Sequence, residues 1–364
     1  MAKNRPVIFI DPKGEPDTLS TLVQCARLTG RENNLLYFSL DSKMSTYNPL
    51  FAGDCDPSII IDGFLSNSQD DNAYYRDVSM MLFTHAYNIL RHLGQPFTVM
   101  DMYAYLNHAQ CFEDVHHILK SCPTAQKSLR TLDLEIKKLN TAHKDWRLAL
   151  IGFNSYPLRF NRPYFNEADP DISISDGIRQ KKIMYFALPV NAYAIQARTV
   201  AQSVQSSLRH VSSLIQSGKL PVDTLVSVYI DEFGSICDPL FVETLNKARS
   251  SGMMVTLGCQ TMHDLAAISD NFMRRVDENT ANKIILRQSD AAMCETIAKS
   301  IGTTMKARKT YRETTGFFGN QIMTGEASVR HVEEFILHPN KIKNLPAYGQ
   351  GGTLSATRAN GWNA

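Results

Sequence analysis

The sequence predicts an α/β fold with a parallel sheet into which an all-α segment is inserted. Short runs of β-branched and aromatic residues, such as residues 7–10, are apolar at every position, as expected of strands that are buried on both faces. Helical periodicity follows these runs, and the resulting strand–helix–strand order favours parallel pairing. Between about residues 55 and 165 the pattern is helical and contains no clean strand signal. We therefore expect a separate helical module there.

The first predicted strand ends at Asp11, and Pro12 and Gly14 break the chain before a helix over residues 19–29. Thr98, with Asp101 three residues later, indicates a capped helix start inside the helical stretch. The other elements follow from periodicity: helices over 78–93, 112–120, 129–146, 193–216, 241–250 and 291–300, and strands over 35–40, 183–188, 225–230, 253–257 and 283–286. Residues 303–331 are polar with little periodicity and are expected to form a loop.

The composition excludes several classes of protein. Of the 364 residues, 43% are apolar, so disorder over most of the chain is excluded. Lys and Arg number 38 against 36 Asp and Glu, and this balance excludes a histone-like electrostatic binder. The 7 cysteines form no CxxC pair, which argues against a zinc ribbon or a disulfide framework and favours a reducing cytosol. No apolar run reaches the roughly 20 residues of a membrane span, so membrane attachment would have to come through a partner or another segment.

The motif with the clearest chemistry is Asp231-Glu232, which follows the apolar strand over residues 225–230 and has the Walker B form. A buried strand of this kind delivers two carboxylates to the edge of the sheet where open α/β sheets bind ligands. Asp231 can hold Mg²⁺, and Glu232 can orient or deprotonate an attacking water. A plain strand-to-loop exit explains the same two residues, so the pattern by itself leaves both readings open.

Two further residues suit the same chemistry. Gln260 follows the next strand, where RecA-like motors place a γ-phosphate sensor, although it can also be a simple loop residue. Arg249 can stabilise transition-state charge on the nucleotide of a neighbouring subunit. The alternative for Arg249 is a solvated side chain near a helix C-terminus, where the helix dipole favours a cation.

Basic residues give two weaker candidates. Lys13 stands at the end of the first strand, where it can touch phosphate or nucleic acid, but a turn built by Pro12 and Gly14 explains the segment equally well. The densest basic run is interrupted by one aromatic residue, which suits single-stranded DNA, and a solvated charged loop is the alternative. The basic residues of this run are Lys306, Arg308, Lys309 and Arg312. His116 and His117 are adjacent on a predicted helix and point apart, so they do not make a metal site.

The order of these motifs resembles the type IV secretion coupling proteins, which are TraD/TraG-like ATPases that bring DNA or protein to a conjugation or secretion channel. The resemblance spans nearly the whole chain, and it is the ordered set of motifs that is specific. The set comprises Asp11-Pro12-Lys13-Gly14-Glu15, Tyr47-Asn48-Pro49-Leu50, Phe186-Ala187-Leu188-Pro189, Ile230-Asp231-Glu232-Phe233-Gly234, Ala248-Arg249-Ser250-Ser251-Gly252 and Gly258-Cys259-Gln260-Thr261, with Val332-Glu333-Glu334-Phe335 and Leu345-Pro346 near the end.

The resemblance implies a RecA-like P-loop NTPase-type sheet with helices on both faces and an inserted all-α domain. It places the RecA-like domain at residues 1–54 and 166–348, the inserted domain at 55–165 and a flexible tail at 349–364. It implies ATP and Mg²⁺ as cofactors, with Asp231 serving the metal, Glu232 the water and Gln260 phosphate sensing. Arg249 would be the arginine finger, and Lys13 a second cofactor-binding residue.

The partners that the resemblance implies are single-stranded DNA, a relaxosome or secreted protein substrate, and the type IV secretion channel. It further implies a homo-hexamer at the cytoplasmic face of the bacterial inner membrane, with membrane contact only through an N-terminal region outside these residues. A non-catalytic docking or adaptor protein of the conjugation apparatus is the first alternative. A helicase or DNA-packaging relative with the same core is the second.

One departure from the family pattern matters. The sequence contains no GxxxxGK[ST] phosphate-binding loop. Without that loop, the backbone N–H cradle and the lysine for the β- and γ-phosphates are missing, and Mg²⁺ loses a Ser/Thr ligand. We therefore expect that residues 1–364 alone do not hydrolyse ATP. In the family the strand before this loop is central, so we also expect the centre of the sheet to be open.

Overall fold

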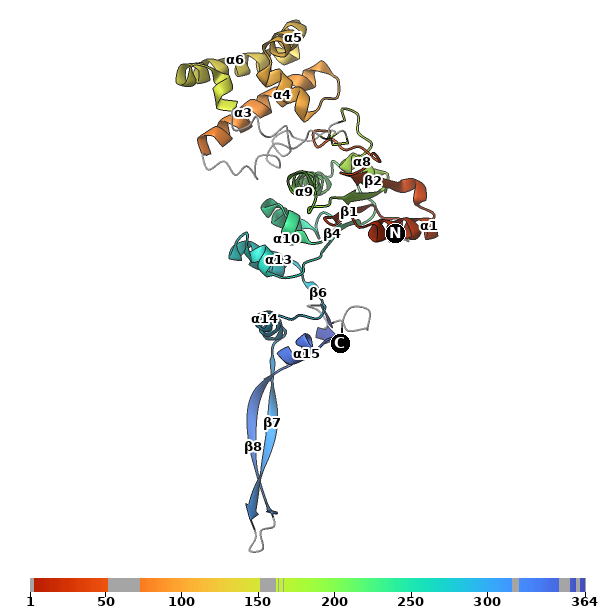
Figure 1. The fold of residues 1–364 in the computed structure, drawn as a ribbon, viewed down its shortest axis with the longest axis vertical. Coiled ribbons are helices and arrows are strands. Elements are labelled where there is room, and N and C mark those ends of the chain that lie inside the picture. Colours follow the sequence, from red (N-terminus) through yellow and green to blue (C-terminus); the bar gives the residue numbers. More distant parts are fainter. Residues whose placement is uncertain are drawn as a thin grey trace. The chain divides into compact units, whose positions relative to one another are not determined.

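The computed structural model describes residues 3–51, 73–150, 162, 164–165, 167–315, 321–346, 354–357 and 361–363 (Figure 1). The chain divides into two compact units, Met1–Val276 and Asp277–Ala364. The sequence did not predict this division. The predicted domain boundaries after residues 54, 165 and 348 stay predictions.

The first unit is built on a five-stranded parallel sheet, which confirms the predicted fold class. Its strands are β1 (Val7–Asp11), β2 (Leu35–Ser39), β3 (Ile183–Ala187), β4 (Val226–Ile230) and β5 (Met253–Leu257). Their order across the sheet is β2-β3-β1-β4-β5, and all four pairings are parallel. The register places Ile8 between Met184 and Val228. Because β1 lies between β3 and β4, three apolar strands form the centre.

Helices cover both faces of this sheet. On one face, α9 (Ala194–Gln216) packs on Ile8 and Ile10 within the larger hydrophobic core, to which α11 (Val242–Lys247) also contributes. On the other face, α1 (Pro16–Leu28) packs on β1 and β3 through Leu22 and Ala26. The remaining helical elements of this unit after β3 are α10 (Phe233–Ile236), η5 (Pro239–Phe241), α12 (His263–Ala266) and α13 (Asp270–Asn279), the last of which runs into the second unit.

Most of the described residues between β2 and β3 are helical. The helical elements described there are α3 (Ala73–Leu90), η2 (Arg91–Leu93), α4 (Val99–Asn107), α5 (Ala109–Leu119), α6 (Pro123–His143), η3 (Trp146–Leu150) and α8 (Ile174–Arg179), and η1 (Glu32–Asn34) lies just before β2. The predicted cap at Thr98 is confirmed as a full capping box, in which Asp101 N donates to Thr98 Oγ1 and Thr98 N donates to Asp101 Oδ2.

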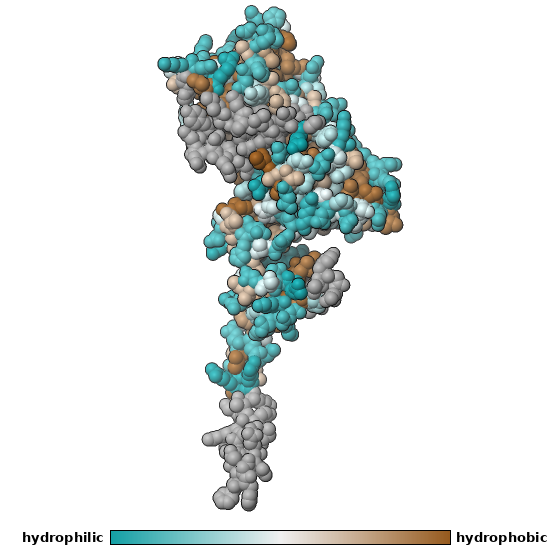
Figure 2. All heavy atoms as spheres, in the orientation of Figure 1, coloured by the Kyte–Doolittle hydropathy of each residue, from teal (hydrophilic) through white to brown (hydrophobic). Residues whose placement is uncertain are grey.

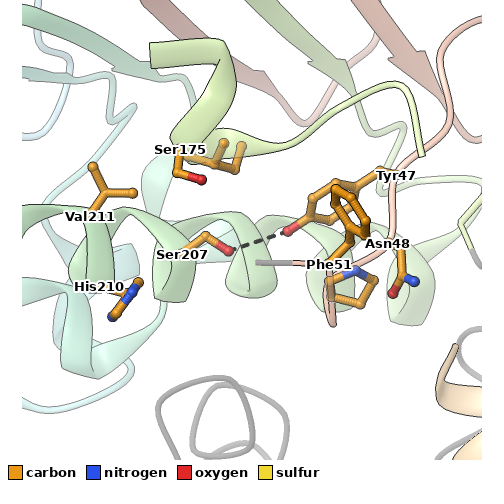
Figure 3. Close-up of a pocket in the computed structure, with 9 residues that line it drawn as sticks. Tyr47, Asn48, Phe51, Ser175, Ser207, His210 and Val211 are labelled. Carbon is orange, nitrogen blue, oxygen red and sulfur yellow. Dashed lines mark hydrogen bonds between the residues drawn. The ribbon is translucent and has the colours of Figure 1, made fainter. Parts of the chain in front are cut away.

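The Tyr47-Asn48-Pro49-Leu50 motif forms a buried link after β2 (Figure 3). The hydroxyl of Tyr47 lies 3.1 Å from Ser203 Oγ and 3.5 Å from Ser207 Oγ on α9. Its ring stacks on Phe165 and meets the edge of Phe186. Asn48 donates from Nδ2 to the carbonyl of Phe97 across 2.9 Å, next to the start of α4. The motif therefore ties β2, α9 and the helical stretch together.

The second unit contains a three-stranded sheet and a long hairpin. In the sheet, β6 (Asn282–Ile285) pairs antiparallel with β9 (Leu354–Thr357), and β9 pairs with β10 (Gly361–Asn363). Helices α14 (Ala291–Ile301) and α15 (Pro339–Lys343) enclose a small core around Cys294, Ala298 and Ile342. The range 349–364, expected to be a flexible tail, contains the strands β9 and β10.

The expected loop over residues 303–331 is wrong. This region forms β7 (Thr303–Thr315) and β8 (Gln321–Phe335), an antiparallel pair with an irregularity between Tyr311 and Glu313 (Figure 1). The hairpin is exposed on both faces where its side chains are described, with Met305 64% and Val329 52% accessible. Hydrophilic residues cover most of its described part in Figure 2. Without a buried face, the strands carry no regular apolar alternation, and this is why the sequence pattern missed them.

The expected gap at the centre of the sheet is also wrong. The centre is filled by β1, and the open position lies at the edge, because β5 has a strand partner on one side only among the described residues. The exposure along β5 supports this, since Met254 is 38% accessible and Thr256 is also exposed. Parallel sheets usually have both faces covered and their edges protected, so β5 is an atypical edge strand.

Candidate functional site

The predicted catalytic side chains meet at the carboxyl edge of the sheet, just beyond three neighbouring strands. Lys13 follows β1, Asp231 and Glu232 follow β4, and Gln260 follows β5. Lys13 Nζ lies 3.0 Å from Glu232 Oε1, and Gln260 Nε2 donates to the same oxygen across 2.5 Å. The structure thus brings four of the predicted residues together, and Gln260 lies beside the acidic pair.

The backbone around the two acids is tightly held. Gly258 N donates to Ile230 O, and Phe233 N donates back to Gly258 O, so the ends of β4 and β5 are tied on both sides of the acids. A Cβ at Gly258 would lie 2.5 Å from Asp231 Oδ1, which leaves room for glycine only. Glu232 has φ 39° and ψ 47°, a left-handed conformation that is costly for a residue with a Cβ. Such strain is concentrated at functional sites in proteins.

Lys13 is presented by a loop that is fixed to the neighbouring strand end. Asp11 Oδ1 accepts from Lys13 N across 2.9 Å, and Asp11 Oδ2 accepts from the Tyr185 hydroxyl across 2.6 Å. Gly14, at φ 64°, packs against Pro189 after β3. The hydrogen bond to Glu232 is the main reason why the pKa of Lys13 is raised above its usual value. The sequence left open whether this segment is a plain turn or presents a cation. In the structure it is a turn that also presents the ammonium of Lys13 to Glu232.

The acidic pair fits a magnesium ion that is shared with a phosphate. Mg²⁺ prefers oxygen ligands and is usually held by one or two carboxylates together with substrate phosphates. Asp231 offers such a carboxylate, with Oδ1 accepting from Glu232 N across 3.0 Å. Within the described part of the chain, no group of three His, Cys, Asp or Glu side chains is placed to hold a metal alone.

A groove of about 400 Å³ leads along the sheet to these residues. It lies on the face that α1 covers in part, and Val7 and Phe9 of β1, Tyr229 of β4 and Thr256 of β5 line it. Tyr229 is 36% exposed, and its ring meets the edge of Phe9. The groove ends at Asp231, so an apolar, incompletely covered sheet face is continuous with the acidic pair.

The basic run of the second unit lies on β7 and not in a loop. Lys306 and Arg308 are two positions apart on the strand, and both pair with Glu334 of β8, at 3.5 Å and 2.5 Å. Arg330 lies opposite Arg308 in the hairpin register and is exposed. The backbone of Lys309 and Arg312 continues β7. Chiefly because of Arg308, the pKa of Glu334 is lowered. This surface is therefore rich in cations, two of which share one carboxylate.

The comparisons with known proteins agree with these observations. Residues 225–347 match the family TraG-D_C, described as the TraM recognition site of TraD and TraG. The matched segment includes Asp231, Glu232, Arg249 and Gln260. Over residues 225–347 the chain is therefore similar to TraD and TraG. No curated protein matches its sequence.

Solved structures of coupling proteins share the fold of this chain. The bacterial conjugative coupling protein TrwBΔN70, in its unbound monoclinic form, matches with a TM-score of 0.61 and 15% identity, over 99% of this chain and 83% of that one. The plasmid coupling protein TrwB in complex with the non-hydrolysable GTP analogue GDPNP matches with a TM-score of 0.56 and 14% identity, over 99% and 84%. At this identity the matches establish the fold, and the predicted RecA-like architecture is confirmed.

Arg249 lies apart from the other predicted site residues of the chain. It is exposed in the turn between α11 and β5, before β5 begins, whereas Asp231 and Gln260 follow the strand ends. The length of β5 thus separates Arg249 from the acidic pair of its own chain. This placement fits both the predicted role on a neighbouring subunit, which stays a prediction, and a solvated side chain just after the C-terminus of α11.

Two further observations concern features that the sequence raised. His116 Nε2 lies 2.9 Å from the Tyr105 hydroxyl, and its ring stacks on Phe112, so this histidine belongs to the packing of the helical stretch. Burial lowers its pKa. Of the helices that the structure describes, none has both the length and the apolar composition needed to cross a bilayer.

Proposed function

We propose that the chain is the motor portion of a type IV secretion coupling protein, which delivers single-stranded DNA or a protein substrate to the secretion channel by hydrolysing ATP. The observation that carries this proposal is the convergence of Lys13, Glu232 and Gln260 on one carboxylate oxygen beside Asp231. Paired acids and a polar amide on adjacent strand ends are what the hydrolysis of a terminal phosphate requires. The complex of TrwB with a GTP analogue adds support that the fold accepts a nucleotide.

In this proposal each residue has one role. Asp231 holds Mg²⁺, which would neutralise phosphate charge when bound, and Glu232 orients the attacking water. Gln260 senses the terminal phosphate, and Lys13 contacts it. Arg249 acts on the nucleotide of the next subunit in a homo-hexamer. Its position before β5, at the amino ends of the strands and away from the acidic pair, favours this role.

We propose further that hydrolysis needs a phosphate-binding loop from a segment outside residues 1–364. Lys13 alone does not offset the charge of a nucleotide's phosphates, because its positive charge already faces two acids, Asp231 and Glu232. A strand paired with the free edge of β5 would end beside Gln260. A helix after that strand would start at the same edge, where its N-terminus favours phosphate.

The handedness of the sheet supports this placement. The connections that run towards β5, such as β3 to β4 through α9, pass over one face, whereas β1 to β2 through α1 runs the other way over the opposite face. This is the right-handed rule for parallel strands. A segment that begins beside β5 and returns inward to β1 must place its helix on the face of α1, where the groove lies.

The reading frame immediately upstream of residue 1 and an ATPase assay test the function together. We expect a frame that encodes GxxxxGK[ST]. The product of that frame joined to residues 1–364, called the reunited protein below, is expected to hydrolyse ATP, whereas residues 1–364 alone are not. The difference in rate is expected to be at least about a hundredfold, because the loop supplies both the backbone cradle and a lysine. If the reunited protein is inactive with and without DNA, the motor assignment is wrong.

We propose that the surface of Lys306, Arg308 and Arg330 binds nucleic acid. Changing all three to Ala is expected to weaken binding of single-stranded DNA and to reduce the slope of log K against log salt by about 0.7 for each phosphate that the protein no longer neutralises. Fluorescence anisotropy at several salt concentrations measures both quantities. Lys299→Ala on α14, an exposed cation of the same unit, is the control. An equal effect of Lys299→Ala would contradict the assignment.

The proposal also covers partners and location. The family description names a TraM recognition site, which supports contact with a relaxosome protein. We propose that the chain works at the cytoplasmic face of the bacterial inner membrane and reaches the membrane through another segment. The second candidate function is a non-catalytic adaptor, which the missing GxxxxGK[ST] favours. An upstream frame without that motif would support the adaptor.

A further inference from the structure

The carboxylate of Glu232 is held by donors from the strand ends on both sides of it. Lys13 lies 3.0 Å and Gln260 2.5 Å from the same oxygen, Oε1. Two donors on one oxygen fix the orientation of the carboxyl group more firmly than either donor would. Glu232 is 24% and Lys13 42% exposed, so the three groups are within reach of a solute.

The contact depends on the fold and not on a freely moving side chain. Asp11 fixes the loop of Lys13 through its own hydrogen bonds to Lys13 N and to Tyr185. The left-handed backbone of Glu232 turns that residue towards the loop, and Asp231 Oδ1 supports this turn by accepting from Glu232 N. A strained backbone that is stabilised from two sides is typical of a functional arrangement.

Lys13 is also a cation that a phosphate at this edge of the sheet would attract. Its ammonium interacts with Glu232 most strongly, then with Asp231 and Glu15. A phosphate dianion carries more charge than one carboxylate and offers several acceptor oxygens to the three N–H donors of a lysine. A phosphate at this edge of the sheet therefore competes with Glu232 for the same cation.

We propose that Lys13 and Gln260 form a clamp on Glu232 that a phosphate group opens. With Lys13 on Glu232, the carboxylate is directed between the two donors. When a phosphate binds Lys13, Glu232 loses its ion pair and retains only the hydrogen bond from Gln260. Its carboxylate then turns to the water that it orients. Lys13 is thus a positioning residue for Glu232, and nucleotide binding itself frees the base. This inference rests on the proposed function for its biological role.

The full chain with ¹³C-dimethylated lysines tests the clamp by NMR, with the Lys13 signal assigned from Lys13→Arg. Dimethylation keeps the positive charge of the lysine and one of its three N–H donors. Glu232→Gln is expected to lower the pKa of Lys13, and Glu15→Gln, which removes the weakest of the three neighbouring charges, is expected to change it much less. Equal shifts in the two variants, or none in Glu232→Gln, overturn the clamp.

Inorganic phosphate, titrated against sodium chloride at equal ionic strength, tests the opening. We expect phosphate to move the Lys13 signal saturably, and Glu232→Gln to bind phosphate about two- to fivefold more tightly because the competing carboxylate is gone. A response equal to that of chloride, or unchanged phosphate affinity in Glu232→Gln, overturns the proposal. If Lys13 responds to phosphate but the reunited protein does not hydrolyse ATP, the clamp stands and the proposed motor function is wrong.

Discussion

Glu232→Gln is expected to reduce kcat for ATP hydrolysis by the reunited protein about 10²- to 10⁴-fold, the usual contribution of a general base. Glutamine keeps the size of the side chain and can still contact Gln260, but it cannot accept a proton from water. Nucleotide affinity is expected to be retained or to rise, since the change removes a negative charge beside the phosphate. A steady-state ATPase assay and a fluorescent nucleotide titration measure the two quantities separately.

Glu243→Gln is the matched control for this prediction. Glu243 lies on α11 of the same unit and pairs with Arg275 at 2.5 Å, away from the strand ends that carry the site. We expect its kcat to stay within about twofold of the parent, because surface ion pairs contribute little. A Glu232→Gln protein that hydrolyses ATP at the parental rate would remove the mechanistic assignment of the acidic pair.

The sheet strands were predictable because each is apolar at successive positions, as Ile183–Ala187 illustrates with all five residues buried. Their order was not predictable. The sequence does not say that β1 lies beside β4, and only this neighbourhood brings Lys13 to Glu232. The acidic pair and Gln260 could be paired in advance because successive parallel strands end at the same edge of a sheet.

The hairpin shows the opposite case. Most of its described side chains are exposed, even the apolar Met305 and Val329, so the burial that creates a period-two pattern is missing. Arg330 was not predicted as part of the basic surface. It is far from Arg308 in sequence, and only the register of β7 and β8 sets the two residues opposite each other.

Tyr47→Ala is expected to destabilise the first unit by about 3–5 kcal/mol, as large-to-small changes of buried aromatic residues do. Tyr47 is 2% exposed, and its ring packs among Phe38, Phe165 and Phe186 (Figure 3 shows its contact with α9). Tyr47→Phe is expected to cost only about 1 kcal/mol, because it keeps the ring and removes the hydroxyl bonded to Ser203.

Urea unfolding followed by the fluorescence of Trp146 measures this destabilisation, in a Trp362→Phe background that leaves one tryptophan. Trp146 is 5% exposed and belongs to the same continuous core as Tyr47, so it reports the unit in which the change is made. Leu28→Ala, at a side chain that is 87% exposed, is expected to change stability by less than about 0.5 kcal/mol. If Tyr47→Phe were as damaging as Tyr47→Ala, the hydroxyl and not the ring would hold the link together. If neither substitution changed stability, the packing of β2 and α9 would not depend on Tyr47.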